Sequence, residues 1–263
     1  MKKERADKIL VARNLAPSLE KARALIMAGQ VSAGGRKVEK PGQSIDAEAP
    51  ILILQNRLYV GRGGLKLAEA LDAFAVPVGG KIGVDLGSST GGFTDCLLKR
   101  GARKVYAVDV DVKQIDWHLR EDPRVVLMEK NARYLKKDDF ADPPDVVTMD
   151  LSFISVLKVL PAVKDFLAAA DLLALLKPQF EAEKGRVGIK GVVRDPAARR
   201  EILEKVLASG QSLGFFTHGL LKCSTRGRKG NREFFVHWRL DGEAKGPGKL
   251  KALVAEEVYD KED

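Results

Sequence analysis

Three acids and one lysine stand at the ends of short apolar runs in the second part of the chain. Asp85, Asp109, Asp150 and Lys177 each end or follow such a run. Asp109 lies 24 positions after Asp85, which is the length of one strand–helix–strand unit. Because ligands of parallel sheets bind beyond the carboxyl ends of the strands, we expect the four side chains to share one site.

The stretch after Asp85 is rich in glycine and hydroxyl residues and indicates a nucleotide-like ligand. Gly87, Gly91 and Gly92 would let the backbone turn sharply into a helix, whose first N–H groups can donate hydrogen bonds. The spacing of the glycines matches neither a P-loop nor the usual dinucleotide pattern. An acidic loop, with Asp109 placed for ribose hydroxyls, suits S-adenosylmethionine. A nicotinamide-linked enzyme or an inactive scaffold stays open, because the fold alone does not fix the function.

Strand and helix patterns alternate from residue 81 onward. Such alternation predicts an α/β fold with a Rossmann-like, doubly wound parallel sheet. After Gly214 the alternation stops, and two apolar runs joined by a loop predict an antiparallel hairpin at the sheet edge. The predicted strands cover 82–85, 104–109, 124–128, 145–150, 172–176, 215–223 and 233–240, and the predicted helices cover 62–71, 92–99, 113–119, 155–169 and 196–208.

The first 58 residues indicate a separate, small α+β module. They hold 11 Lys or Arg and 6 Asp or Glu, so they carry +5 of the chain's net charge of +9. Helix patterns near 7–13 and from Ser18 precede a hairpin signal at 31–38 and a strand at 51–54. Clustered cations beside an enzyme-like domain favour RNA binding over a merely solvated basic surface.

A second basic segment joins the two runs of the predicted edge hairpin. Residues 222–232 hold five basic residues and no acid, with glycines at 227 and 230 that would make the loop mobile. Positive charge without compensating acids is unfavourable unless a polyanion is expected. We therefore interpret this loop as a phosphate clamp beside the site, with a solvated turn as the alternative.

Composition narrows the class of protein. The chain has 263 residues, 45% of them hydrophobic, which allows two domains with real cores. Cys96 and Cys223 are too few for a disulfide scaffold and fit a cytoplasmic setting, while the three scattered histidines give no zinc pattern. The longest uncharged run, 206–221, is too short and polar to span a membrane, and the charged N-terminus does not look like a signal peptide.

The first module resembles the small RNA-binding module of ribosomal small-subunit protein four, which recurs in pseudouridine synthases. The matching stretches are Arg5-Ala6-Asp7, Lys21-Ala22-Arg23, Ile26-x-x-Gly29-x-Val31 and Gly35-x-x-Val38-x-Lys40-Pro41-Gly42. Ala6 stands where such modules usually have leucine. The resemblance implies that the second helix and the hairpin face structured RNA. The RNA-binding residues we expect are Arg5, Lys8, Lys21, Arg23, Arg36 and Lys37, together with Arg62, Arg226, Arg228 and Lys229.

The rest of the chain, taken with this module, looks like the TlyA family. Members carry the name haemolysin and are similar to FtsJ-type 2′-O-ribose methyltransferases. Gly61 departs from the family, which more often has serine there. Besides the glycine loop, the resemblance rests on Tyr59-Val60-Gly61-Arg62-Gly63-Gly64-Leu65-Lys66, Asp150-Leu151-Ser152-Phe153-Ile154, Leu176-Lys177-Pro178-Gln179-Phe180-Glu181 and Val192-Val193-Arg194-Asp195-Pro196.

The resemblance implies S-adenosylmethionine-dependent methylation of a ribose 2′-hydroxyl in ribosomal RNA, at a cytidine. It places the catalytic set at Lys66, Asp150, Lys177 and Glu233. A hydroxyl is a weak nucleophile and needs a base or strict positioning. We expect Lys177 to be the base, Lys66 a neighbouring cation that favours its neutral form, and the two carboxylates to orient the ammonium groups. No metal is expected.

The cofactor would lie along the glycine turn. We expect Asp85 and Gly87 at its methionine end, Ser89, Thr90, Gly91 and Gly92 along the turn, Asp109 at the ribose, and Asp150 beside it.

The expected domains are 1–58 (RNA-binding module), 59–241 (methyltransferase) and 242–263 (a charged tail, either an amphipathic helix or disordered). The expected protein is a cytoplasmic monomer that acts on ribosomal RNA or ribosomal subunits, with no membrane partner. A non-catalytic RNA-binding protein and a cytolysin remain alternatives.

Overall fold

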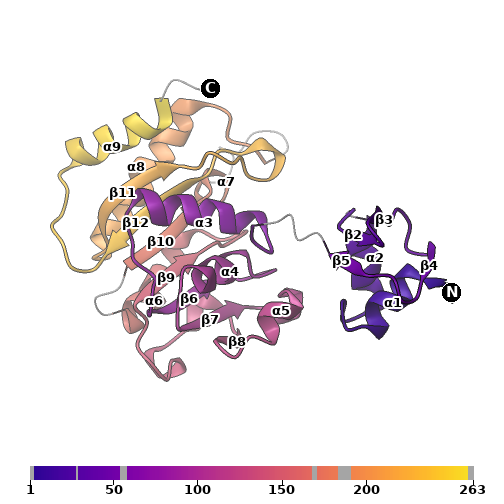
Figure 1. Ribbon diagram of the computed structural model, residues 1–263. Coiled ribbons are helices and arrows are strands. Elements are labelled where there is room, and N and C mark those ends of the chain that lie inside the picture. Colours follow the sequence, from indigo (N-terminus) through magenta and orange to yellow (C-terminus); the bar gives the residue numbers. More distant parts are fainter. Residues whose placement is uncertain (1–2, 28, 54–57, 168–170, 183–190, 260–263) are drawn as a thin grey trace. The chain divides into compact units, whose positions relative to one another are not determined.

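The computed structural model describes residues 3–27, 29–53, 58–167, 171–182 and 191–259. The chain divides into two compact units, Met1–Leu58 and Tyr59–Asp263 (Figure 1). Each unit has its own hydrophobic core.

The first unit is a small α+β fold. Its helices pack their apolar faces on a core that includes Leu10, Ala22 and Val31, all fully buried. Strand β2 pairs with both β3 and β5. Strand β1 pairs with β4, and these two strands were not predicted from the sequence. The elements are β1 (Lys3–Arg5), α1 (Ala6–Ala12), α2 (Leu19–Met27), β2 (Val31–Ala33), β3 (Arg36–Lys37), β4 (Ser44–Asp46) and β5 (Ile51–Ile53).

The second unit is built on a seven-stranded sheet with the order β11-β12-β10-β9-β6-β7-β8. Strands from β10 to β8 are parallel to one another, whereas β12 is antiparallel to both of its neighbours. This confirms the predicted Rossmann-like sheet and its antiparallel strands. The strands are β6 (Ile82–Leu86), β7 (Lys104–Asp109), β8 (Val125–Glu129), β9 (Val146–Met149), β10 (Asp171–Leu176), β11 (Phe216–Lys222) and β12 (Phe234–Arg239).

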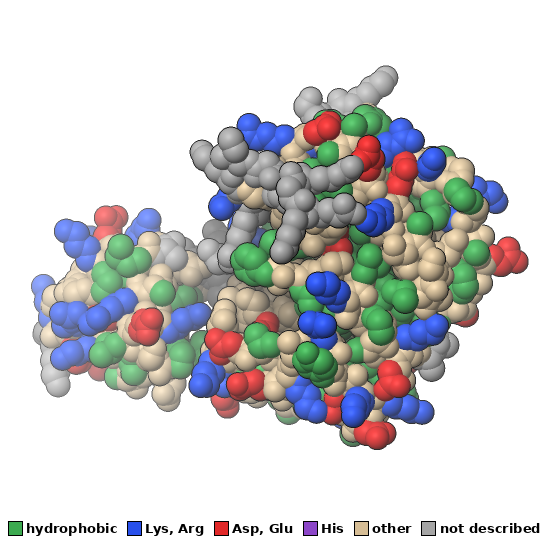
Figure 2. Space-filling view, turned by 180° about the vertical axis from the view of Figure 1, so that it is seen from behind, with side chains coloured by type: hydrophobic (Ala, Val, Ile, Leu, Met, Phe, Trp, Pro, Cys, Tyr) green, Lys and Arg blue, Asp and Glu red, His purple; other side chains and the backbone are tan. Residues whose placement is uncertain are grey.

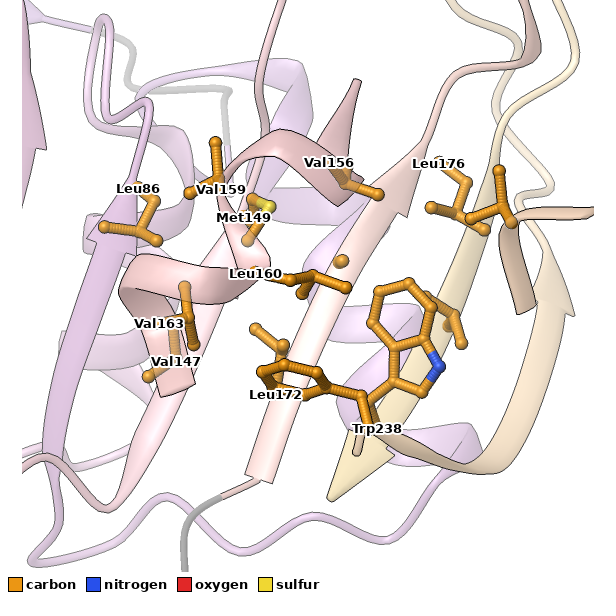
Figure 3. Packing of buried hydrophobic residues seen from close by; sticks show 14 of the residues in the cluster. Leu86, Val147, Met149, Val156, Val159, Leu160, Val163, Leu172, Leu176 and Trp238 are labelled. Carbon is orange, nitrogen blue, oxygen red and sulfur yellow. The ribbon is translucent and has the colours of Figure 1, made fainter. Parts of the chain in front are cut away.

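Helices cover both faces of this sheet, because its central strands are apolar on both sides. On one face, Leu173 and Leu175 of β10 pack with α3 (Arg62–Ala73) and α4 (Gly92–Lys99). On the other face, Leu172 and Leu176 pack with α6 (Leu160–Phe166), α8 (Pro196–Ser212) and α9 (Pro247–Tyr259). The close view in Figure 3 shows Leu160 of α6 lying among side chains of this second layer.

Two predicted helices are shorter than expected, because side chains cap the backbone inside them. Asp111 and Asp116 accept hydrogen bonds from nearby backbone N–H groups, which splits 113–119 into a 3₁₀ turn η1 (Val112–Gln114) and α5 (Trp117–Arg120). Ser155 similarly caps η4 (Val156–Lys158), so that α6 begins only at Leu160. Residues 168–170 of the predicted helix lie outside the described residues.

The expected charged tail contains a helix that belongs to the second unit. Leu250, Val254 and Val258 of α9 are buried in the layer that also contains α8. The carboxylate of Glu257 accepts a hydrogen bond from the backbone N–H of Lys222, 2.5 Å away at the end of β11. Between 247 and 259 the segment is therefore an ordered amphipathic helix.

Trp238 is the largest fully buried side chain of the second unit and should carry much of its stability. Its indole N–H donates to Thr217 Oγ1 at 3.0 Å, and its ring packs against Gly210. We expect Trp238→Ala to lower the free energy of unfolding by about 3–5 kcal/mol, because it removes buried area and leaves a cavity. Urea unfolding followed by circular dichroism measures this. Tyr134→Ala, at an exposed aromatic, is the control and should change stability by less than about 0.5 kcal/mol. Equal effects of the two substitutions would contradict the conclusion that Trp238 contributes much of the stability of the second unit.

Candidate active site

Two lysine–carboxylate pairs form the centre of the site. Lys66, on α3, makes a short, buried ion pair with Glu233, the residue directly before β12. Lys177, directly after β10, pairs with Asp150, which follows β9, at 2.5 Å. Residues 167 positions apart in the chain thus meet, and each predicted lysine has one of the predicted carboxylates as its partner.

The ammonium group of Lys177 has three acceptors in reach. Besides Asp150 Oδ1, its Nζ donates to the carbonyl oxygen of Leu151 at 2.8 Å and to Ser152 Oγ at 3.2 Å. The contact with Asp150 Oδ1 is an ion pair without hydrogen-bond geometry, so Lys177 makes two hydrogen bonds and one ion pair within the described residues. The ring of Phe180 lies 5.8 Å away, and the side chain of Lys177 is only 11% exposed. The structure therefore holds this side chain firmly.

The two pairs lie in the same region of the second unit. A Cβ atom on Gly63, three residues before Lys66, would lie 3.7 Å from Asp150 Oδ2. The buried thiol of Cys223 is a second marker. Burial raises its pKa, the charge of Lys66 lowers it, and the charges of Glu233 and Asp150 raise it further. Lys66 and Glu233 of one pair and Asp150 of the other therefore all lie near this thiol.

The glycine-rich turn begins where β6 ends. Backbone N–H groups of Gly87 and Ser88 both donate to the carbonyl of Val108, and Gly91 N donates to Ser88 O at 2.7 Å. Gly87 has φ +85°, and a Cβ atom there would lie 2.6 Å from the carbonyl oxygen of Asp150. Only glycine fits this position, which brings the turn directly against the segment that carries Asp150.

Asp85 lies beneath this turn and is completely buried. Its Oδ2 accepts hydrogen bonds from the backbone N–H of Thr94 at 2.9 Å and from its hydroxyl at 2.7 Å. Burial raises the pKa of Asp85 to about 7, and the bonds from Thr94 oppose this shift. The structure thus places Asp85 as an internal anchor of α4 rather than as a residue on the surface of the site.

Asp109 orders the turn from the neighbouring strand. Its Oδ2 accepts from Ser89 N at 2.9 Å and its Oδ1 from Asp111 N at 3.1 Å, which leaves each oxygen with further accepting capacity. Ser89 and Thr90 are exposed, and Ser88 Oγ is buried without a hydrogen-bond partner among the described residues. The turn therefore presents polar groups that a bound ligand could satisfy.

The last two glycines of the turn serve the packing of helices. A Cβ atom on Gly91, where φ is +92°, would lie 2.2 Å from Leu119. Gly92 and Gly64 bring α4 and α3 together, and a Cβ atom on Gly64 would lie 2.7 Å from the carbonyl oxygen of Gly92. Sequence reasoning had assigned Gly91 and Gly92 to the ligand, but in the structure both are buried.

The basic loop at 222–232 is held at several points, which differs from the mobility expected of its glycines. Ser224 donates from its backbone and hydroxyl to Glu69 of α3, and Asn231 binds the backbone of Val193 and Gly191. A Cβ atom on Gly227 would lie 1.9 Å from Glu233 Oε1. Arg226 and Lys229 are exposed, and the side chain of Arg228 lies outside the described part of the structure.

In the first unit, the predicted RNA-binding cations include a preorganised pair of arginines. Asp7 is fully buried and accepts from Arg5 at 3.0 and 2.7 Å and from Arg23 at 3.2 Å. The hydrogen bond from Arg5 is the main cause that lowers the pKa of Asp7 to about 2. Lys8, Arg36 and Lys37 are exposed, Lys21 is partly buried, and Lys and Arg side chains cover much of the visible face of this unit (Figure 2). Arg62, in the second unit, is an exposed residue at the start of α3.

Sequence reasoning gave no role to several residues that bind the predicted ones. Ser152 and the carbonyl of Leu151 hold Lys177, Thr94 holds Asp85, and Glu181 binds the segment after Asp150. Ser152 and Glu181 stand inside the motifs quoted for the family resemblance, which was the one available signal.

Neither a membrane-spanning helix nor a metal cluster occurs among the described residues. No described helix is long and apolar enough to cross a membrane. No cluster of three His, Cys, Asp or Glu side chains suited to a metal ion occurs in the described segments.

Comparison with known proteins gives a family match for each of the two units. The model of the family described as FtsJ-like methyltransferase matches residues 59–240, and that of the S4 domain matches residues 4–51. The 16S/23S rRNA (cytidine-2′-O)-methyltransferase TlyA of Mycobacterium tuberculosis is 42% identical over 242 residues, 90% of each chain. Hemolysin A of Brachyspira hyodysenteriae is 40% identical over 237 residues, 89% of this chain and 99% of the relative. A solved structure from Streptococcus thermophilus, described as a candidate hemolysin, has 39% identity and a TM-score of 0.73, and covers 99% of this chain and 97% of its own.

The buried carboxyl of Asp85 should make the stability of the protein depend on pH. Its folded pKa of about 7 lies above the unfolded value of 3.8, so between these values the unfolded chain releases a proton that the folded chain keeps. The free energy of unfolding should therefore fall as the pH rises from about 4 to about 7, by up to about 4 kcal/mol from this group.

Asp85→Asn keeps the acceptor for Thr94 and cannot ionise. Urea unfolding of the wild type and of this variant between pH 4.5 and 8 measures the difference. The variant should gain stability relative to the wild type up to about pH 7 and then stay level. Parallel curves would show that Asp85 does not titrate as described.

Proposed function

The chain belongs to the TlyA family of FtsJ-like methyltransferases, and we propose that it transfers a methyl group from S-adenosylmethionine to a ribose 2′-oxygen of ribosomal RNA. One observation carries this proposal above the others. Lys66–Glu233 and Lys177–Asp150, two ammonium–carboxylate pairs from distant parts of the chain, lie together beside a glycine-rich turn at the carboxyl ends of parallel strands.

The residues around the turn fit S-adenosylmethionine. Asp109 has accepting capacity left for ribose hydroxyls, and exposed Ser89 and Thr90 line the outer side of the turn. The buried, unpartnered hydroxyl of Ser88 is a polar group that a ligand would satisfy. Asp85 acts indirectly, because it fixes the first turn of α4. Gly87 lets the turn approach the backbone of Asp150.

Bound S-adenosylmethionine supplies a methyl group on a positively charged sulfur. Lys177 would contact the ribose 2′-hydroxyl in exchange for one of its present acceptors, the carbonyl of Leu151 or the hydroxyl of Ser152. As the proposed general base, Lys177 would accept the proton of the hydroxyl. Asp150 keeps Lys177 oriented through this exchange. As the new oxygen–carbon bond forms, the sulfur–carbon bond breaks, and the hydroxyl proton ends on Lys177 Nζ.

Lys66 and Glu233 support the reaction electrostatically. Their pair is buried, so its charges act with little screening by water. The Lys66 ammonium is held by Glu233 and would stabilise negative charge on the attacking ribose oxygen. Holding the oxygen, methyl carbon and sulfur in line would supply much of the remaining acceleration.

The RNA would be ribosomal. Relatives at 42% identity are named for modifying 16S and 23S rRNA at cytidine, and this chain carries an S4 domain with exposed cations. We therefore assign ribosomal subunits or their RNA as substrate, with cytidine as the target and the cytoplasm as the place of action. The basic loop after β11 would bind RNA phosphates through Arg226, Arg228 and Lys229.

The enzymatic proposal is tested by transfer of tritium from labelled S-adenosylmethionine to purified ribosomal subunits, followed by mapping of the labelled nucleotide. We expect the label on a ribose 2′-oxygen. Lys177→Ala should lower the rate by about 10²–10⁴-fold, because a proton acceptor is lost. Lys158→Ala, at an exposed lysine, should leave it unchanged. Label on a base would contradict the reaction, and no transfer at all would favour a non-catalytic RNA-binding protein.

The RNA-binding role of the first unit is tested at Arg36, which is exposed on β3. We expect Arg36→Ala to weaken binding to ribosomal RNA and to make the plot of log K against log salt shallower by about 0.7–0.9, the contribution of one phosphate contact. Filter binding at about 50–300 mM salt, where phosphate contacts weaken strongly, measures both the affinity and the slope. Arg103→Ala, at an exposed cation of the second unit, is the control. An unchanged slope for Arg36→Ala would remove this residue from the interface.

A further inference from the structure

Two segments at the carboxyl ends of neighbouring strands are bonded to each other at both of their ends. One segment follows β9 and runs from Asp150 to Val156, and the other follows β10 and forms α7 (Pro178–Glu181). At one end, Lys177 contacts Asp150, Leu151 and Ser152. At the other end, Glu181 Oε2 accepts from Ser155 Oγ at 2.5 Å, and Glu181 Oε1 accepts from Val156 N at 2.9 Å.

We propose that Glu181 is a positioning residue for methyl transfer, which holds the segment 150–156 so that its acceptors meet the ammonium of Lys177. This inference rests on the proposed function. Glu181 itself touches none of the reacting groups that we have assigned, so it acts through the segment. Its position in the chain, four residues after Lys177, lets one short helical turn bind both ends of the neighbouring segment.

The segment needs such a tie because its backbone is strained. Phe153 has φ +64° without being a glycine, a conformation that costs about 1–3 kcal/mol and persists only when its surroundings impose it. Its side chain is 88% exposed, so burial contributes little to holding it, although its ring lies 5.1 Å from that of Phe180. The bonds of Lys177 before Phe153 and those of Glu181 after it bracket the strained residue.

Both oxygens of Glu181 act as acceptors, and burial raises its pKa while the bonds from Ser155 and Val156 oppose this rise. Two separate donors, a hydroxyl and a backbone N–H, point at its two oxygens. A carboxylate satisfies both at once, and bonds to a charged acceptor are stronger than bonds between neutral groups. The hydroxyl of Ser155 also accepts from Leu157 N at 3.2 Å, which begins η4. Glu181 thus fixes both the end of the segment and the start of the next element.

The loss of this tie should show in the chemical step more than in binding. Without Glu181, the acceptors of Lys177 lie on a segment free to relax around Phe153, and a misplacement of about 1 Å at a reacting group costs about 10²-fold in rate. The glycine turn and the first unit are not contacted by Glu181 in the described bonds, so affinity for cofactor and RNA should persist.

The test compares Glu181→Ala, Glu181→Gln and Ser155→Ala with the wild type, and uses Glu243→Ala, at an exposed acid, as the matched control. For each protein, kcat and KM with ribosomal RNA, Kd for S-adenosylmethionine, the melting temperature, and hydrogen exchange at amides 151–156 are measured. We expect Glu181→Ala to lower kcat about 10–100-fold with KM and Kd within about twofold. Exchange at the amide of Val156 should become faster.

Two further comparisons separate positioning from general stability. Glutamine retains an acceptor for Val156 and can donate to Ser155, so Glu181→Gln should recover most of kcat. The double variant Glu181→Ala with Ser155→Ala should lose no more than Glu181→Ala alone, because both substitutions break one tie.

A kcat for Glu181→Ala within about twofold of the wild type would overturn the proposal. A change confined to the melting temperature or to KM would overturn it as well, because positioning acts on kcat. If the wild type transfers no methyl group, the proposed reaction fails. The tie is then decided by exchange alone: an unchanged rate at Val156 in Glu181→Ala refutes it, and a faster rate supports it.

Discussion

The buried ion pair between Lys66 and Glu233 is the constraint around which the second unit is arranged. A charged group removed from water must meet an opposite charge, since an unpaired one costs several kcal/mol. Lys66 comes from α3, before the sheet begins, and Glu233 comes from the last part of the sheet. Their contact therefore fixes α3 against β12. Gly227, whose position leaves no room for a side chain beside Glu233, extends the same constraint to the basic loop.

The sheet supplies the remaining geometry through its strand order. Strands β10, β9 and β6 are neighbours, so the residues at their carboxyl ends become neighbours too. Lys177 follows β10, Asp150 follows β9, and the glycine turn follows β6. Asp109 reaches the same turn from β7. A parallel sheet brings distant parts of the chain together at the carboxyl ends of its strands, so short loops are enough to form a site of this kind.

Much of this fold could be predicted from the sequence, because buried parallel strands are short, continuous apolar runs. The predicted and observed limits of β6, β7 and β10 differ by one residue at most. The predictions were less accurate where local side chains compete with helix formation, as at Asp111, Asp116 and Ser155, whose caps depend on the chain's actual course. The strands β1 and β4 were missed because they have neither the apolar run of β5 nor the glycine turn that joins β2 and β3.

The motifs predicted which residues form the site but not all of the groups that those residues contact. Motifs identified Lys177 and Asp150, but the carbonyl of Leu151 that also holds Lys177 has no signature in the sequence. Asp85 stood at the expected strand end, yet its burial under Thr94 depends on how α4 packs. Roles that depend on a backbone group, or on two loops meeting, become visible only with tertiary structure. The roles of the individual site residues therefore stay proposals.

The last described helix, α9, has a consequence for how the protein is made. Its apolar side chains complete the layer that also contains α8, and Glu257 holds the end of β11. During synthesis, the earlier strands leave the ribosome with that face of the sheet still uncovered. The second unit can close this layer only after translation has passed residue 259, whereas the first unit, finished some two hundred residues earlier, can fold while the rest is still being made.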